Sequence, residues 1–230
     1  MTEELLNFLK KLDIEPKDKQ IYFNAFVHRS YLNEHPEAEP SNERLEFLGD
    51  AVLELLTTQY LYKNMKGTEG DLSSIRAASV KTTTLAVICQ RMGLADHLLL
   101  SRGEENTGGR EKEGLLADLF ESFLGAVYLD QGLIKAKEIF DNYLLHYIKD
   151  IVKNKKYIDP KTYLQEVTQE NFKALPEYKI IEETGPDHNK IFKMSVEVNG
   201  DILGEGQGPS KQRAQEEAAH NALDKLEVKK

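Results

Sequence analysis

The stretch from Asn42 to Leu56 reads Asn-Glu-Arg-Leu-Glu-Phe-Leu-Gly-Asp-Ala-Val-Leu-Glu-Leu-Leu. At about 100° per residue this spacing predicts an amphipathic helix, which is capped by Ser41 or Asn42 and continues to about Lys63. The apolar face is expected to hold Leu45, Leu48, Val52, Leu55 and Leu56. The opposite face is acidic and holds Glu43, Glu46, Asp50 and Glu54.

The acidic face has two interpretations. A solvated row of carboxylates is common on surface helices. Like charges at helical spacing repel one another, however, and only Arg44 lies nearby to offset them. Hard divalent cations bind carboxylate clusters of this kind. Phe47 and Leu53 flank the carboxylates, so we expect another surface to cover these two apolar side chains.

A second acidic pair lies in a helix expected over 115–130. Asp118 and Glu121 are one turn apart in an otherwise apolar run. Two ionised carboxylates in such surroundings are unfavourable unless they are paired or bind a metal. A solvated pair would be the usual interpretation, but the apolar neighbours favour metal ligation here.

Bulk properties limit the class of protein. The chain has 230 residues, 40% hydrophobic and 30% charged, as in soluble globular proteins of one or two domains. No apolar run approaches the roughly 18 residues of a membrane span, and the N-terminus is not signal-like. Cys89, the single cysteine, is expected to be a core thiol in a reducing compartment. We therefore expect a cytoplasmic protein with no membrane partner.

The net charge of −9 taken alone argues against nucleic-acid binding, for which a basic surface is usual. It does not exclude such binding, because carboxylates loaded with a metal present a positive centre to phosphate. Local basic clusters can also act against an acidic background.

The remaining segments before residue 153 are also expected to be helices and loops. Further helices are predicted within 3–32, over 72–92 and over 133–153, and polar loops over 34–40 and 101–112. The triplet His28-Arg29-Ser30 is interpreted as a helix C-terminus with favourable cations.

The pattern changes after a basic linker at 153–158. Asp159 and Pro160 begin a capped helix. Strands are predicted over 177–184 and 190–199, and a third over 201–205 after a turn at Asn199-Gly200. An alanine-rich helix over 211–226 completes an α-β-β-β-α order.

The run Asn-Glu-Arg-Leu-Glu-Phe-Leu-Gly-Asp-Ala-Val-Leu resembles, nearly letter for letter, the signature of the ribonuclease III family of double-stranded RNA endonucleases. Asp118-x-x-Glu121 is similar to the second carboxylate motif of that family, with Gly114 where serine or proline commonly opens the helix. The resemblance implies a mainly α protein: an all-helical endonuclease domain at 1–152, a linker at 153–158 and a small α+β double-stranded RNA-binding domain at 159–228.

The same resemblance implies a reaction and its residues. It implies Mg²⁺-dependent hydrolysis, with Mn²⁺ able to replace Mg²⁺, that leaves 5′-phosphate and 3′-hydroxyl ends with short 3′ overhangs. Ribosomal RNA precursors and other structured transcripts are the expected substrates. The implied site consists of metal ligands Glu46, Asp118 and Glu121, catalytic Asp50 and Glu121, and outer carboxylates Glu43 and Glu69. A homodimer with Phe47 at its interface is implied as well.

An RNA-binding domain of this type reads the shape of the duplex across two minor grooves. The positions implied to contact RNA are Gln165, Glu166, Gln169, His188, Lys190, Lys211 and Arg213. The family usually has two adjacent lysines where this chain has Lys211-Gln212. Residues 159–230 hold 10 Lys and Arg against 14 Asp and Glu, a formal charge of −4, so we expect weaker binding than by a basic domain.

Two alternatives stay open on the sequence. A non-cleaving double-stranded RNA-binding protein of the same fold would be expected to lack some of the six carboxylates, which are all present. A metal-dependent phosphohydrolase for small nucleotides would leave residues 159–230 without a role. Incubation with long duplex RNA, with and without Mg²⁺, separates all three.

Overall fold

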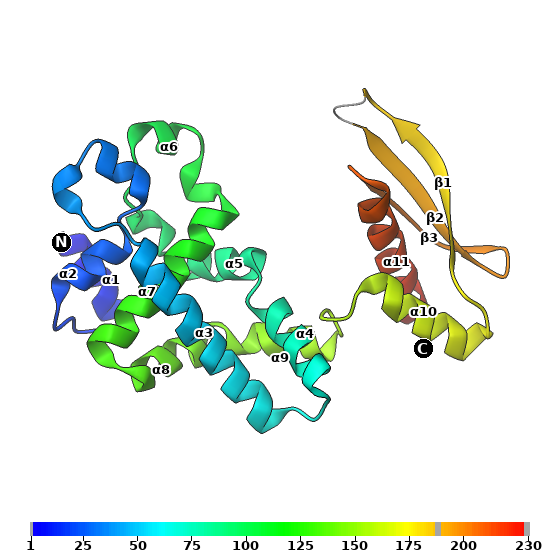
Figure 1. Cartoon of the computed structure of the whole chain (residues 1–230), viewed down its shortest axis with the longest axis horizontal. Helices are drawn as coiled ribbons and strands as arrows, with labels where there is room; N and C mark the ends of the chain where they lie inside the picture. Colours follow the sequence, from blue (N-terminus) through cyan, green and yellow to red (C-terminus); the bar gives the residue numbers. More distant parts are fainter. Residues whose placement is uncertain (1, 187–189, 228–230) are drawn as a thin grey trace. The chain divides into compact units, whose positions relative to one another are not determined.

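The computed structural model describes residues 2–186 and 190–227. The chain folds as two compact units, Met1–Tyr157 and Ile158–Lys230, which are labelled by element in Figure 1. The first unit is helical, and the second has the order α-β-β-β-α, so the predicted fold class is confirmed. Within the described ranges no helix is both long enough and apolar enough to cross a membrane.

The first unit contains α-helices joined by turns and short 3-10 helices. The α-helices are α1 (Glu3–Lys11), α2 (Lys19–Ala25), α3 (Glu43–Asn64), α4 (Glu69–Ser79), α5 (Thr82–Met92), α6 (Arg102–Asn106), α7 (Glu113–Gln131), α8 (Leu133–Tyr143) and α9 (Leu145–Lys153). The 3-10 helices are η1 (Arg29–Asn33), η2 (Pro36–Ala38), η3 (Ala95–His97) and η4 (Gly109–Glu111).

Helix α7 is the central helix of this unit. Its side chains are buried on nearly every face, and Phe120 and Phe123 are fully buried. Helices α2, α3, α5 and α8 all pack on α7, and α3 crosses it (Figure 1). A helix that is apolar on all sides is typically buried in such a core. This burial explains the apolar composition of the run from Leu115.

The buried face of α3 differs from the predicted one. Leu53, expected on the acidic side, is fully buried in the core of its own unit, whereas Leu55 is 52% exposed. The reason is the crossing with α7, which lies at Gly49. That crossing turns inward the residues three, four, seven and eight positions after Gly49, which are Val52, Leu53, Leu56 and Thr57.

Two predicted helices are each divided in two. The helix expected over 72–92 consists of α4 and α5, and the one expected over 133–153 consists of α8 and α9. Three successive threonines begin α5, and β-branched residues have low helix propensity. Leu144, between α8 and α9, is fully buried, so the break there holds a core side chain. The loop expected over 101–112 contains α6, which Ser101 caps through the Glu104 N–H, and η4.

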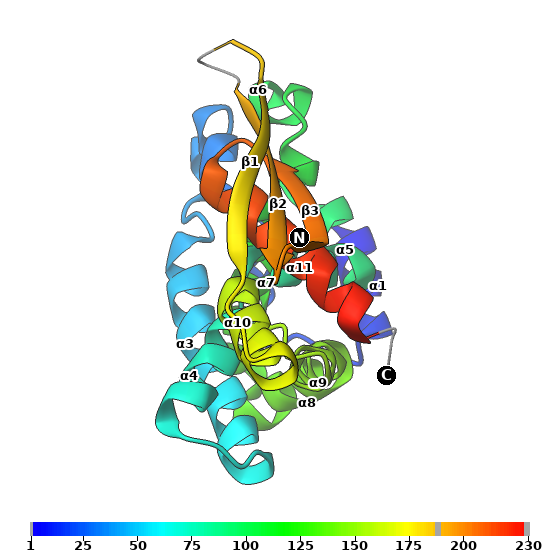
Figure 2. The same cartoon turned by 90° about the vertical axis from the view of Figure 1, so that its right-hand side faces the viewer.

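The second unit is a three-stranded antiparallel sheet covered by two helices on one face (Figure 2). Its elements are α10 (Pro160–Phe172), β1 (Glu177–Thr184), β2 (Ile191–Val198), β3 (Asp201–Gly208) and α11 (Lys211–Glu227). The predicted turn is confirmed by positive φ angles at Asn199 (53°) and Gly200 (89°). The alanine-rich face of α11 packs on the sheet, and its buried residues include Ala218 and Ala222.

Candidate active site

The candidate site forms where α3 and α7 cross. A Cβ atom at Gly49 would overlap the carbonyl oxygen of Glu121, and one at Gly125 would overlap the carbonyl oxygen of Leu45. Only glycine therefore lets the two backbones approach this closely. The contact sets the acidic face of α3 beside the acidic turn of α7.

Three carboxylates converge at the crossing. Glu46, Asp118 and Glu121 each place an oxygen within 4.8 Å of the other two. All three side chains are half-buried, and they come from both helices. Hard cations such as Mg²⁺ and Mn²⁺ take oxygen ligands of this type, so the donor set fits a divalent cation. The cluster can bind a metal.

The electrostatics of the cluster point the same way. Burial, together with the negative charges of Asp50, Asp118 and Glu46, raises the pKa of Glu121 to about 8. Burial also raises the pKa of Glu46 and of Asp118. Neither a lysine nor an arginine is among the groups acting on these three described carboxylates. A cation among them would favour their ionised forms.

Two more predicted carboxylates lie beside this cluster. Asp50 is exposed one turn after Glu46 on α3, and its charge raises the pKa of Glu46 and Glu121. Glu43 lies at the start of α3, where one oxygen is 3.8 Å from Arg29 and the other accepts a hydrogen bond from Ser41. Both carboxylates thus lie at the border of the cluster, where their charges act on Glu46.

Glu69 is not part of this group. It begins α4, and its carboxylate accepts a 3.0 Å hydrogen bond from the Ser73 hydroxyl. Its side chain lines a mainly apolar cavity of about 420 Å³ between α3 and α4. The other lining residues are Thr58, Leu61, Tyr62, Leu72, Ser73 and Arg76.

The sequence interpretation missed His28 as a neighbour of the site. The helix C-terminus expected there is wrong, since α2 ends at Ala25 and His28 caps the N-terminus of η1. The charge of His28 acts on Asp118, so the ring lies near the cluster. The His-Arg-Ser triplet was the signal in the sequence, but its fold context could not be read from spacing.

The predicted RNA contacts of the first helix share one exposed face. Gln165, Glu166 and Gln169 are exposed on α10, while Leu164 and Thr168 turn into the core. The α10 face therefore presents polar side chains to solvent.

The basic residues predicted to contact RNA are engaged in ion pairs. Glu183 lies 3.6 Å from Lys190 and 3.4 Å from Lys211. The Lys211 ammonium also lies 5.6 Å from the centre of the Phe192 ring. Arg213 pairs instead with Glu216 at 3.0 Å. The predicted contact at His188 lies outside the residues that the structure describes.

Comparison with known families matches both units. Residues 18–148 match the model of a Ribonuclease-III-like family, and residues 160–226 match the double-stranded RNA binding motif. Ribonuclease 3 of Pseudothermotoga lettingae is 40% identical over 227 residues, covering 96% of this chain and 95% of that protein. Ribonuclease 3 of Streptococcus pneumoniae is 44% identical over 226 residues, covering 97% of both chains.

Two solved structures of a nuclease domain are similar to this chain. A nuclease domain of Ribonuclease III from Campylobacter jejuni, described for flexibility in a region involved in dimer formation, is 41% identical with a TM-score of 0.55. It covers 60% of this chain and 93% of that domain. A second structure of that nuclease domain, at 2.2 Å resolution, is 39% identical, with a TM-score of 0.56, and covers 62% and 95%.

Proposed function

The chain belongs to the ribonuclease III family of double-stranded RNA endoribonucleases, and from this premise we propose how it cuts and what it cuts. The reaction is Mg²⁺-dependent hydrolysis of both strands, with Mn²⁺ able to replace Mg²⁺. It leaves 5′-phosphate and 3′-hydroxyl ends with short 3′ overhangs. The substrates are ribosomal RNA precursors and other structured transcripts, processed in the cytoplasm.

The observation that carries this proposal is the convergence of Glu46, Asp118 and Glu121 within 4.8 Å on a chain that also has a double-stranded RNA-binding fold. These three carboxylates would hold the cation. When bound, the cation supplies water activation at neutral pH, relief of phosphoryl charge and stabilisation of the leaving 3′-oxygen. Burial and the neighbouring carboxylates raise the pKa of Glu121, and a cation bound among them would favour its ionised form.

The remaining carboxylates act around the cation. Asp50 is exposed beside the cluster, so its carboxylate accepts the proton of the attacking water. Glu121 contributes to catalysis as well as to ligation. Glu43 acts from the outer border, where Arg29 holds it. Glu69 acts from the N-terminus of α4 as an outer residue toward the substrate.

The second unit binds the duplex by shape. Gln165, Glu166 and Gln169 contact one minor groove from α10, and the segment with His188 and Lys190 enters the next. Lys211 and Arg213 at the start of α11 contact phosphates between the grooves. We assign the functional boundaries 1–152 to the nuclease domain, 153–158 to the linker and 159–228 to the RNA-binding domain.

The nuclease unit acts as a homodimer with α3 at its interface. Phe47 is 80% exposed, Leu55 52% and Tyr62 79%, and these residues follow one another along one face of α3. Burial of a side chain such as Phe47 contributes about 1.5–3 kcal/mol. A two-fold axis near Leu55 would set the α3 helices of two copies antiparallel and cover the whole stripe.

The cavity between α3 and α4 supports this arrangement. In an antiparallel pair about Leu55, position 47 of one copy faces position 63 of the other, which is next to Tyr62. Tyr62 and Leu61 line the cavity of about 420 Å³, which has enough room for a phenyl ring. Phe47 of each copy is therefore the occupant of the partner cavity, and the two acidic clusters share one RNA duplex.

A direct test uses long duplex RNA labelled on both strands, incubated with the protein in Mg²⁺ and in a chelator. Short duplex products with ligatable 5′-phosphates are expected in Mg²⁺, and intact RNA in the chelator. Cleavage that is unaffected by the chelator would contradict the proposal. Products of unspecific cutting in single strands would contradict the assignment of duplex RNA as the substrate.

A further inference from the structure

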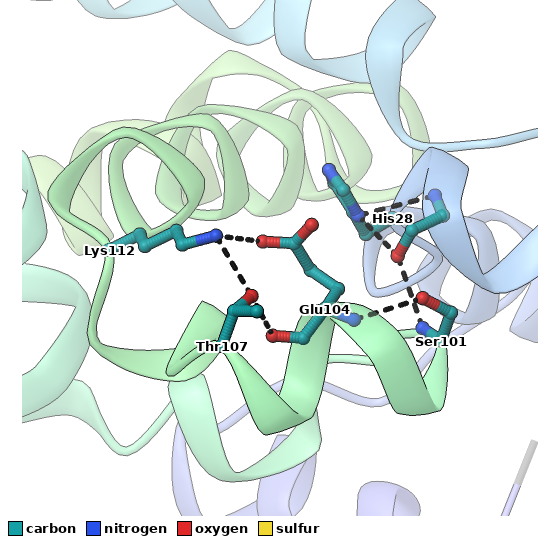
Figure 3. Close-up of polar contacts among 6 residues, drawn as sticks. His28, Ser101, Glu104, Thr107 and Lys112 are labelled. Carbon is teal, nitrogen blue, oxygen red and sulfur yellow. Dashed lines mark hydrogen bonds and ion pairs between the residues drawn. The ribbon is translucent and has the colours of Figure 1, made fainter.

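A polar network joins the turn at His28 to α6 (Figure 3). The charge of His28 acts on Asp118, so this network lies near the acidic cluster. His28 Nδ1 accepts a 3.2 Å hydrogen bond from the Ser30 N–H and lies 2.8 Å from the Ser30 hydroxyl oxygen. That oxygen accepts a 3.1 Å hydrogen bond from the Ser101 N–H. The backbone adds a further tie, because the His28 N–H donates to the Leu99 carbonyl at 3.1 Å.

These bonds select the hydrogen position on the imidazole. Because Nδ1 accepts a bond from a backbone N–H, it carries no hydrogen, and the neutral ring must carry its hydrogen on Nε2. Burial lowers the pKa of His28, which favours the neutral ring. Figure 3 shows the second ring nitrogen of His28 on the far side of the ring from the dashed contacts of Nδ1. Among the described residues Nε2 has no hydrogen-bond partner, so Nε2–H is available as a donor.

Charged groups from four elements surround this imidazole. Glu104 of α6, Asp118 of α7 and Glu43 of α3 act on it as negative charges, and Arg29 of η1 as a positive one. Lys112 holds the Glu104 carboxylate by a 2.6 Å hydrogen bond, and it also bonds Thr107 at 3.2 Å (Figure 3). The imidazole thus lies near the Glu104 carboxylate, which Lys112 holds, and within electrostatic reach of Asp118 in the acidic cluster.

An RNA phosphate can approach this cluster once a bound cation offsets the negative charge of the carboxylates. A hydrogen-bond donor at the border would then fix the position of the phosphate. His28 offers a rigid donor, because its ring is fixed on the Nδ1 side and by the backbone bond to Leu99. Arg29 is 74% exposed at its side chain and is paired with Glu43, so it is a weaker positional anchor.

We propose that His28 is a substrate-binding residue whose Nε2–H donates a hydrogen bond to a phosphate oxygen of the RNA strand at the acidic cluster. The proposal rests on the proposed cleavage of duplex RNA. It assigns to the His-Arg-Ser turn a role in the reaction, with Ser30 and Ser101 as positioning residues that hold the ring.

A purely structural role makes the opposite prediction for two substitutions. If His28 only caps η1, the important atom is Nδ1, and asparagine replaces it well because asparagine is a good N-cap. Glutamine is a poor N-cap, but its amide nitrogen reaches about as far as Nε2. The variants His28→Asn and His28→Gln therefore distinguish the role of Nδ1 as an N-cap from the role of Nε2–H as a hydrogen-bond donor.

The test measures kcat/KM for duplex RNA cleavage in Mg²⁺ together with the melting temperature of each variant. His28→Asn is expected to lower kcat/KM by about tenfold to a hundredfold, the range for a hydrogen bond to a charged group, without lowering the melting temperature. His28→Gln is expected to retain more activity than His28→Asn. Cleavage by His28→Gln that is no better than by His28→Asn would overturn the proposal.

A matched control is His146→Asn, since His146 is bonded to Arg91 on α5. It is expected to leave kcat/KM unchanged. The wild-type reaction in the same assay distinguishes a failure of the proposed cleavage function from a failure of the proposed role of His28. An inactive wild type would contradict the cleavage function itself, whereas an active wild type with an equally active His28→Asn would contradict only the role of His28.

Discussion

Gly49 of α3 and Gly125 of α7 face each other where the two helices cross: a Cβ atom at Gly125 would lie 3.1 Å from the Gly49 nitrogen. The carboxylates of Glu46 and Glu121 lie within one turn of these glycines. The cluster therefore depends on a backbone contact that side chains would prevent. This relationship links the packing of the core to the chemistry proposed for the site.

The first prediction concerns this crossing. Gly49→Ala should destabilise the protein by at least about 1–3 kcal/mol, because the new methyl group overlaps the Glu121 carbonyl and forces the helices apart. Gly114→Ala, in α7, is the control, because a Cβ atom at Gly114 meets nothing within 4 Å. Alanine has a higher helix propensity than glycine, so this variant should be as stable as wild type or more stable by up to about 1 kcal/mol. Urea unfolding measures both. A Gly49→Ala protein as stable as Gly114→Ala would contradict the packing argument.

The second prediction concerns pH in metal-free buffer. The pKa of Glu121 rises from 4.5 to about 8 on folding, so between these values the folded state binds the extra proton and the free energy of unfolding falls as pH increases. Glu121→Gln removes this penalty. At pH 8.5 with chelator the variant should be more stable than wild type by on the order of 1–3 kcal/mol, after allowance for partial exposure.

The difference should shrink toward pH 5, where the folded wild-type carboxyl is neutral. Mg²⁺ should then stabilise the wild type at pH 8.5 and not the variant. Melting curves at the two pH values measure this. An advantage of Glu121→Gln that is the same at both pH values would show that the pKa of Glu121 is not raised.

The third prediction concerns the dimer. Phe47→Ala should raise the dimer dissociation constant by about tenfold or more, since it removes a side chain expected to be buried in the partner cavity. Leu72→Trp, which fills that cavity, should have a similar effect. Ile134→Ala is the matched control, because Ile134 is also 80% exposed but lies on α8. Sedimentation as a function of concentration measures all three, and equal effects of Phe47→Ala and Ile134→Ala would argue against this interface.

The fourth prediction concerns the acidic RNA-binding unit. Glu183 pairs with both Lys190 and Lys211, so it competes with RNA phosphates for the two ammonium groups. Glu183→Gln should tighten duplex binding by about threefold to tenfold, since exposed ion pairs contribute about 0.2–1 kcal/mol each. Glu182→Gln makes the same change in net charge on the preceding residue and is the control for that change.

Salt titrations complete this test. Lys211→Ala should weaken binding and reduce the slope of log affinity against log salt by about one. If Glu183→Gln binds duplex RNA no more tightly than Glu182→Gln, Glu183 does not compete with RNA phosphates for Lys190 and Lys211.

Much of the fold could be predicted from local patterns. The strands and both helices of the second unit follow from period-two alternation, the Asn199-Gly200 turn and the Asp159 cap, and the structure has them within a few residues of the predicted ends. The carboxylate pair on α7 was visible because ionised groups in an apolar helix need a partner. Local chemistry was sufficient in these places.

Tertiary contacts explain what could not be predicted. The inward turn of Leu53 and the exposure of Leu55 depend on where α7 crosses α3, which helical periodicity does not contain. Leu144 lies between α8 and α9 and is fully buried in the core, a contact that the helical pattern of the sequence does not show. The proximity of His28 to Asp118 joins segments 90 residues apart in sequence and becomes visible only after folding.

The most direct measurement for the central claim is single-turnover cleavage of long duplex RNA by Glu121→Gln, with RNA binding measured in parallel. The variant keeps the volume of the side chain and removes one of the three carboxylates that lie within 4.8 Å of one another. We predict that cleavage in saturating Mg²⁺ falls by a factor of about 10³ or more, while duplex affinity stays within about threefold of wild type. Near-normal turnover by Glu121→Gln would contradict the assignment of this cluster as the metal-binding active site.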